Sequence, residues 1–171
     1  MLTDGVIELR LPTMDDVDAI VAAVQDPEIP KWTNVPSPYT REDAIGWIEQ
    51  TIEGRAAGRT QAFLAFLDGE LAASAALMEL DKRPGYGEIG YWVAAAARRR
   101  GVGSRACVLL REFGIAELGL TRIELLVHED NVPSQRTAER AGFSDTGERV
   151  PAPRQEVPGP PNHIVYAWSA S

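Results

Sequence analysis

The chain has 171 residues, 44% hydrophobic and 25% charged, a composition typical of a single globular domain spanning residues 1–171. It contains no apolar run near the roughly 18 residues of a membrane span and no signal-peptide pattern, so we expect a cytoplasmic protein without membrane contact. The net charge of −8 argues against nucleic-acid binding, because phosphate backbones would repel the chain. One cysteine and two histidines are a poor ligand supply, so we expect no metal.

The first part of the chain predicts one strand and two helices. Alternating apolar residues indicate the strand, and apolar residues at helical spacing indicate the helices. Four prolines lie between the two helices and favour an irregular loop. The predicted elements are a strand at Val6–Leu11, a helix from Thr13 to before Pro27, a loop over residues 27–39, and a helix from Thr40 to about Gly54.

The rest of the chain predicts mainly strands. Asp68 and Gly69 suit a tight hairpin turn between the strands Gln61–Leu67 and Glu70–Met78. Together with the first part, this order predicts one mixed α/β sheet. The further elements are a strand at Gly87–Ala94, a helix from Gly101 to Gly119, a strand at Ile123–Val127, a helix from Asn131 to Gly142, a weak strand at Phe143–Val150, a proline-rich loop at Pro151–Pro161 and a strand at His163–Ser169.

A basic segment with two glycines interrupts this acidic chain. Gly101 and Gly103 at the start of a helix let backbone amides close on a phosphate, where the helix dipole adds about half a positive charge. The segment therefore predicts an anion site, although a solvated helix face has the same composition. Five of the seventeen basic residues lie within fourteen positions: Arg98, Arg99, Arg100, Arg105 and Arg111.

Dinucleotide binding is a weaker interpretation of the same glycines. Gly101, Gly103 and Ala106 fit the fingerprint G-x-G-x-x-A. However, residues 95–100 separate the first glycine from its strand, and the segment follows an antiparallel run of strands. Glu124, the acid about 20 residues further on, also falls inside a strand rather than at its end.

Three motifs together resemble the GCN5-related N-acetyltransferase (GNAT) superfamily. Arg98-x-x-Gly101-x-Gly103 looks like its acyl-CoA pyrophosphate loop, and Asn131-Val-Pro-Ser134 followed by Gly142-Phe143 resembles its later motif. The segment Glu88-Ile-Gly-Tyr-Trp-Val93 is similar to the RimJ/RimL-type subgroup. The resemblance implies a largely antiparallel twisted sheet flanked by helices, with a splayed parallel strand pair at the acyl-CoA site.

The same resemblance implies a cofactor site for acetyl-CoA as co-substrate. The strand ending at Val93 would splay from the strand around Ile123–Val127, and its free backbone groups would pair with the pantetheine arm. Asn131 and Ser134 would lie along the cofactor near its thiol. The residues expected at the pyrophosphate are Arg98, Arg100, Gly101, Val102, Gly103 and Ser104.

Acetyl transfer to an amine needs a proton acceptor, because an α-amino group with a pKa of about 8, or a lysine with a pKa of about 10, is mostly protonated at pH 7. Glu88 is the best candidate, since its strand leads to the expected acyl site. A surface glutamate would give the same pattern. His128, at the end of the next strand, is an alternative base.

The leaving thiolate calls for a proton donor, and several residues are candidates for that role. Many family members have a tyrosine seven residues after the motif asparagine, but here that position is Ala138. Ser134 is the candidate replacement, although a serine in the first turn of a helix is usually a backbone cap. Tyr91 and Tyr166 are further options, whereas Cys107 is interpreted as a packing residue.

The sequence thus predicts an acetyl-CoA-dependent N-acetyltransferase acting on a primary amine, of a protein N-terminus or a small molecule, by direct attack in a ternary complex. Trp32, Tyr39 and Trp92 are candidates for the acceptor pocket. The family resemblance favours a homodimer. A noncatalytic acyl-CoA-binding or regulatory module stays open as an alternative, because the tyrosine is missing at Ala138.

Overall fold

The computed structural model describes residues 1–153 and 159–170 and contains an eight-stranded sheet in the order β1-β2-β3-β4-β5-β6-β8-β7. Neighbouring strands are antiparallel except for the parallel pair β5–β6. The predicted fold class is therefore confirmed. The strands are β1 Leu2–Thr3, β2 Ile7–Arg10, β3 Gln61–Leu67, β4 Glu70–Met78, β5 Tyr86–Val93, β6 Arg122–His128, β7 Ser144–Val150 and β8 His163–Ser169.

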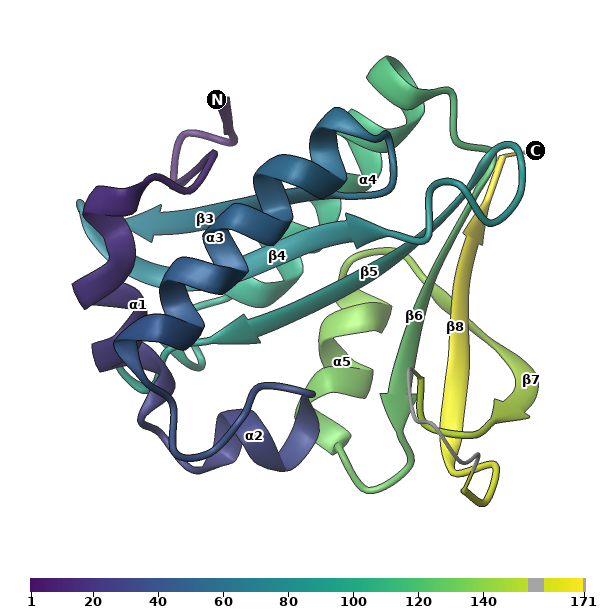
Figure 1. Ribbon diagram of the computed structural model, residues 1–171. Coiled ribbons are helices and arrows are strands. Elements are labelled where there is room, and N and C mark those ends of the chain that lie inside the picture. The colour runs from purple at the N-terminus through teal and green to yellow at the C-terminus, as the bar shows by residue number, and fades with distance from the viewer. Residues whose placement is uncertain (154–158, 171) are drawn as a thin grey trace.

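Helices cover both faces of the sheet. In Figure 1, α1 and α3 lie in front of the sheet, and α4 and α5 lie behind it. No helix among the described residues is long and apolar enough to cross a membrane. The helices are α1 Val17–Val24, α2 Glu28–Trp32, α3 Arg41–Ala56, α4 Val102–Leu118 and α5 Val132–Arg140, with short 3₁₀ turns at Met14–Asp16 and Ala95–Ala97.

Strand β5 separates two apolar cores, because successive side chains of a strand point to opposite faces. Ile89 belongs to the larger cluster, together with Cys107 and Leu110 of α4. Trp92 packs against the smaller cluster, which includes Ile20 of α1 and Ile48 of α3. The two faces of β5 thus pack against different sets of helices.

Local signals in the sequence account for several of these elements. Asp68 and Gly69 adopt φ angles of 54° and 83°, the positive values that a tight hairpin turn requires. Thr40 begins α3 with a capping box, in which its hydroxyl accepts from the Asp43 amide and the Asp43 carboxylate accepts from the Thr40 amide. The predicted boundaries of β5 and β6 differ from the observed ones by one residue at each end.

The predicted loop over residues 27–39 is wrong in part, because α2 occupies residues 28–32. Pro30 is tolerated there because it lies in the first turn, where a helical amide has no partner within the helix. The Asp26 carboxylate also accepts from the Glu28 amide and steadies the start of α2. Of the predicted loop Pro151–Pro161, residues 154–158 lie outside the described residues, and the remainder contains neither helix nor strand.

Candidate active site

Strands β5 and β6 form a V that opens toward their carboxyl ends. They pair only at Tyr86–Arg122, Gly87–Ile123 and Glu88–Glu124. Beyond Glu88, β5 remains paired with β4 as far as Val93, whereas β6 remains paired with β8 as far as His128. Figure 1 shows the two strands diverging, with α5 visible through the opening. The predicted splay is confirmed, and it leaves one backbone edge of β5 available to a ligand.

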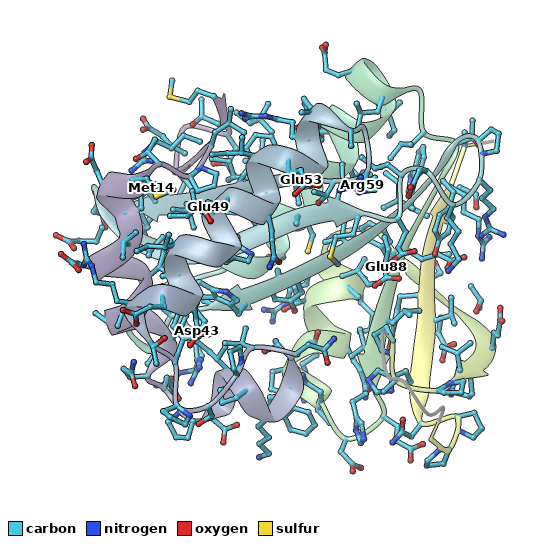
Figure 2. The ribbon with its side chains drawn as sticks, in the orientation of Figure 1. Met14, Asp43, Glu49, Glu53, Arg59 and Glu88 are labelled. Atoms are coloured by element: carbon cyan, nitrogen blue, oxygen red, sulfur yellow. The ribbon has the colours of Figure 1, made fainter. Side chains whose placement is uncertain are left out.

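Glu88 lies at the apex of this V. It is the last residue of β5 paired with β6, and the residue is only 4% exposed. It lines a groove of about 630 Å³ on the same face of the sheet as α1 and α3. Figure 2 shows Glu88 beside the point where β5 and β6 separate. The predicted base is therefore a carboxylate at a strand junction rather than a surface glutamate.

A second carboxylate, Glu124, stands beside Glu88 on the neighbouring strand. Its oxygens accept from the Tyr86 hydroxyl at 2.9 Å and from Arg122 Nε at 2.6 Å, and Arg83 Nη2 lies 3.6 Å away. Burial and the hydrogen bond to Glu124 raise the pKa of the Tyr86 phenol. The sequence pattern alone does not single out this network, although an acid within the apolar strand Ile123–Val127 is its visible signal.

The opposite face of β5 carries a pair of hydroxyl groups. Tyr91 Oη and Ser134 Oγ are 2.9 Å apart. Asn131, not Ser134, caps α5, because the Asn131 Oδ1 accepts from the Ser134 amide at 3.2 Å. Burial raises the pKa of Tyr91 to about 12, so its hydroxyl is protonated at neutral pH. The Ser134 hydroxyl is therefore available for a role other than capping.

The glycine segment forms the start of α4, as the motif predicts. Gly101 has a φ of 79°, a left-handed conformation that favours glycine. A Cβ atom on Gly103 would lie 3.2 Å from Tyr91, 3.3 Å from Thr137 and 3.4 Å from Val93. No side chain caps α4, so its first backbone amides are free to bind an anion.

The arginines next to these glycines contact carboxylates in the structure. Arg98 Nη2 lies 2.8 Å from Asp26, and Arg100 Nη2 lies 2.9 Å from Asp68. A bound phosphate would have to share these guanidinium groups with the two aspartates. The Ser104 hydroxyl donates to the Gly101 carbonyl at 3.0 Å. The backbone at the start of α4 is therefore better prepared for an anion than the arginine side chains are.

Two of the three predicted acceptor-pocket residues, Trp32 and Trp92, lie near the open end of the V. The Trp32 ring centroid in α2 is 5.5 Å from that of His128, the last residue of β6. Tyr39 and Trp92 pack against the smaller core cluster. His128 follows Glu124 by four residues, which places it about 13 Å further along the strand. The structure thus separates the alternative base from Glu88.

Two other residues considered for a chemical role, Cys107 and Tyr166, have other contacts in the structure. Cys107 is fully buried, and burial raises its thiol pKa to about 12, as expected for a packing residue. The Tyr166 hydroxyl donates to Glu139 at 3.4 Å. Within residues 1–153 and 159–170, no group of three His, Cys, Asp or Glu residues could hold a metal ion.

Structural comparison places this fold among known acetyltransferases. RimJ from Mycobacterium smegmatis, solved with a CoA disulfide, superposes with a TM-score of 0.81 at 21% identity, over 96% of this chain and 82% of that one. RimL, a ribosomal L7/L12 α-N-protein acetyltransferase solved with coenzyme A, gives a TM-score of 0.82 at 21% identity, over 99% and 96% of the two chains. At these identities the likeness concerns the fold alone.

Sequence comparison agrees with the fold. The uncharacterized N-acetyltransferase p20 of Bacillus licheniformis is 29% identical over 146 residues, which are 82% of this chain and 80% of that protein. The family model described as an acetyltransferase (GNAT) domain matches residues 7–144, which is most of the chain. The protein therefore belongs to the GNAT family, as its motifs predict, and is an N-acetyltransferase.

Proposed function

We propose that the protein transfers an acetyl group from acetyl-CoA to a primary amine, by direct attack within a ternary complex. The observation that carries this proposal is the V between β5 and β6, with Glu88 on one face and the Ser134–Tyr91 pair on the other. An amine that attacks from one side and a thiol that leaves on the other need a proton acceptor and a proton donor on opposite faces.

The residues present fit acetyl-CoA, which would supply an activated acetyl group. The uncapped start of α4 offers amides of Val102, Gly103 and Ser104 to a pyrophosphate. The absence of a Cβ at Gly103 lets this helix start pack closely against β5 and α5. The free edge of β5 toward Val93 offers backbone groups to an amide-containing arm. Asn131 belongs to the same site through its cap on α5, which fixes the position of Ser134.

Glu88 is the proposed proton acceptor, directly or through a water molecule. Its burial at the apex fixes it beside the place where the acceptor amine enters from the groove. Backbone amides near Val93 would stabilise the negative charge that develops on the acyl oxygen. On the other face, Ser134 would donate a proton to the leaving sulfur, with Tyr91 as its hydrogen-bonding partner.

The relatives support an amine on a protein N-terminus or on a small molecule as the acceptor. RimL is described as an α-N-protein acetyltransferase, and another neighbour, MccE, was solved with acetyl-CoA and AMP. Loops that bind acceptors vary more than the scaffold that positions them. The acceptor is therefore proposed as a class, primary amines, and not as one compound.

Calorimetric titration with acetyl-CoA, CoA and NAD in a low-phosphate buffer tests cofactor binding. We expect binding of acetyl-CoA and CoA but not of NAD. Release of CoA, followed with a thiol reagent, then tests transfer to N-terminal peptides, polyamines and aminoglycosides. No binding of acetyl-CoA would refute the proposal. Binding without amine-dependent CoA release would indicate the noncatalytic acyl-CoA-binding module instead.

Replacing the proposed base is the residue-level test. Glu88→Gln keeps the side-chain volume but removes the proton acceptor, so kcat should fall by about 100-fold or more. Glu49→Gln is the matched control, because Glu49 is exposed on α3, away from the groove (Figure 2). Equal activity of Glu88→Gln and the unmodified protein would remove Glu88 from the mechanism.

A further inference from the structure

The groove beside Glu88 extends well beyond the apex of the V, toward the start of β5 and β6. Its volume of about 630 Å³ lies within the roughly 300–1,000 Å³ of small-molecule sites, so the groove can hold more of the acceptor than the reacting amine. Its far end is therefore available to a second part of the acceptor. Among the described residues, the lining is Glu79, Lys82, Arg83, Tyr86, Glu88, Arg122, Glu124, Leu126, Glu148, Val150, Pro151, Pro153 and Val165.

Carboxylates occupy the end of this groove nearest the open V. Glu88 is the last paired residue of β5, at the point of divergence. Arg149 on β7 pairs with Ile164 on β8, so the preceding residue, Glu148, lies close to Val165. Val165 in turn pairs with Leu126, which is two residues beyond Glu124 on β6. This end therefore suits the cationic amine that is to be acetylated.

Cationic side chains gather at the other end. Arg122 lies two residues before Glu124, about 7 Å further from the open V. Arg83 stacks on the Tyr86 ring at 4.1 Å, and Lys82 Nζ lies 5.8 Å from the same ring centroid. Both belong to the connection that precedes β5.

Two carboxylates lie among these cations. Glu124 accepts from Arg122 at 2.6 Å and lies 3.6 Å from Arg83, and Glu79 supplies the other carboxylate at this end of the groove. Over the whole groove, the described lining holds three cations and four carboxylates, and the cations are gathered at the end nearest the start of β5. The Arg83 side chain is 55% exposed, and its contacts are with the buried Tyr86 ring and with Glu124, so a ligand carboxylate would share Arg83 with Glu124.

We propose that the groove binds an acceptor that carries a carboxylate near its amine, with the amine at Glu88 and the carboxylate at Lys82 and Arg83. The inference rests on the proposed function and assigns a substrate class to it. Two sources share this chemistry: an acidic side chain next to a peptide N-terminus, and the terminal carboxylate of an amino acid or short peptide. In both kinds of acceptor, the positive amine and the negative carboxylate would each face groove residues of the opposite charge.

The first test compares acceptors that differ only in charge. The peptides are Ala-Asp-Ala-Ala, Ala-Asn-Ala-Ala and Ala-Lys-Ala-Ala as C-terminal amides, together with Ala-Ala as a free acid and as an amide. We expect kcat/KM to be about 10-fold higher for at least one carboxylate form than for its neutral counterpart. Preference for the Asp peptide identifies a side chain as the source, and preference for free Ala-Ala identifies a terminal carboxylate.

The second test removes the cations. The double variant Lys82→Ser and Arg83→Ser should raise KM for the carboxylate acceptors until their kcat/KM no longer exceeds that of their neutral counterparts. Arg140→Ser is the control, since Arg140 is an exposed cation at the end of α5, on the other face of the sheet. Thermal unfolding of each variant verifies that both remain folded.

The outcomes separate this inference from the proposed function. Equal kcat/KM for acidic, neutral and basic acceptors, or a preference that survives the loss of Lys82 and Arg83, would overturn the inference and leave acetyl transfer established. Absence of transfer to every amine, including the peptides and polyamines, would overturn the proposed function and the inference with it.

Discussion

The Ser134–Tyr91 pair offers a sharp test of the proton donor. Ser134→Ala removes one hydroxyl and leaves the amide of residue 134 capped by Asn131, so α5 should persist. The substitution breaks one hydrogen bond between neutral groups, at 2.9 Å, which is worth about 0.5–1.5 kcal/mol. The free energy of unfolding should fall by no more than that.

The effect on catalysis should be larger than the effect on stability. A thiol with an ordinary pKa of about 8.5 leaves fairly well as a thiolate, so the loss should lie near the low end for general acids, about 10- to 100-fold in kcat. Tyr91→Phe keeps Ser134 but removes its partner, so we expect a smaller loss, about 3- to 10-fold. Because Ser134 donates the proton in this scheme, the double variant should be no slower than Ser134→Ala alone.

The assay is CoA release at saturating acetyl-CoA and acceptor, with urea unfolding of each variant alongside it. Ser144→Ala is a matched control, because Ser144 is exposed on β7. The Tyr91 pKa of about 12 implies that the contribution of the pair is constant between roughly pH 6 and pH 9. An unchanged kcat for Ser134→Ala would refute the assignment, as would a loss of kcat matched by unfolding of the variant.

Three further predictions concern α4 and the ion pair between Arg10 and Asp16. Gly103→Val should weaken acetyl-CoA binding by about 10-fold or more, because even a Cβ atom would lie within 3.4 Å of three side chains and the larger side chain would displace the start of α4. Calorimetry measures the affinity, and an unchanged affinity would contradict this prediction. Cys107 should resist a thiol reagent in the folded protein and react on unfolding in urea, since it is fully buried with a pKa of about 12. Burial alone would raise the pKa of Asp16, but hydrogen bonds from Arg10 and Thr13 lower it overall. The stability that Asp16 contributes is therefore present above about pH 4 and is lost as the pH falls through the lowered pKa. Asp16→Asn should flatten the dependence of urea unfolding on pH in this range.

The fold was predictable because its signals are local. The Asp68–Gly69 turn, the Thr40 cap and the glycines of α4 each act within a few residues, and each has the predicted conformation or contact. The helix α2 was not predictable in the same way. Its prolines favour a loop by composition, and only the position of Pro30 within the first turn makes a helix compatible with them.

The residues of the candidate site could be predicted only where they belong to a sequence motif. Glu88 and Ser134 stand in segments with a family pattern, whereas Glu124 and Arg83 meet through contacts between residues far apart in the chain. Whether the Ser134 hydroxyl caps α5 or pairs with Tyr91 could also be decided only from the structure. Both Asn131 and Ser134 are suitable capping residues, and only the geometry shows that Asn131 takes the role.

The placement of Glu88 follows from the same pattern that folds the sheet. Six residue pairs hold β5 in register with β4, from Ala73–Val93 to Met78–Glu88. A slip by one residue would turn the Glu88 carboxylate into the larger apolar cluster, where Ile89 now lies, at a cost of several kcal/mol. The hydrophobic alternation of β5 thus selects the face that Glu88 occupies, so substitutions that loosen this register should reduce activity before they unfold the protein.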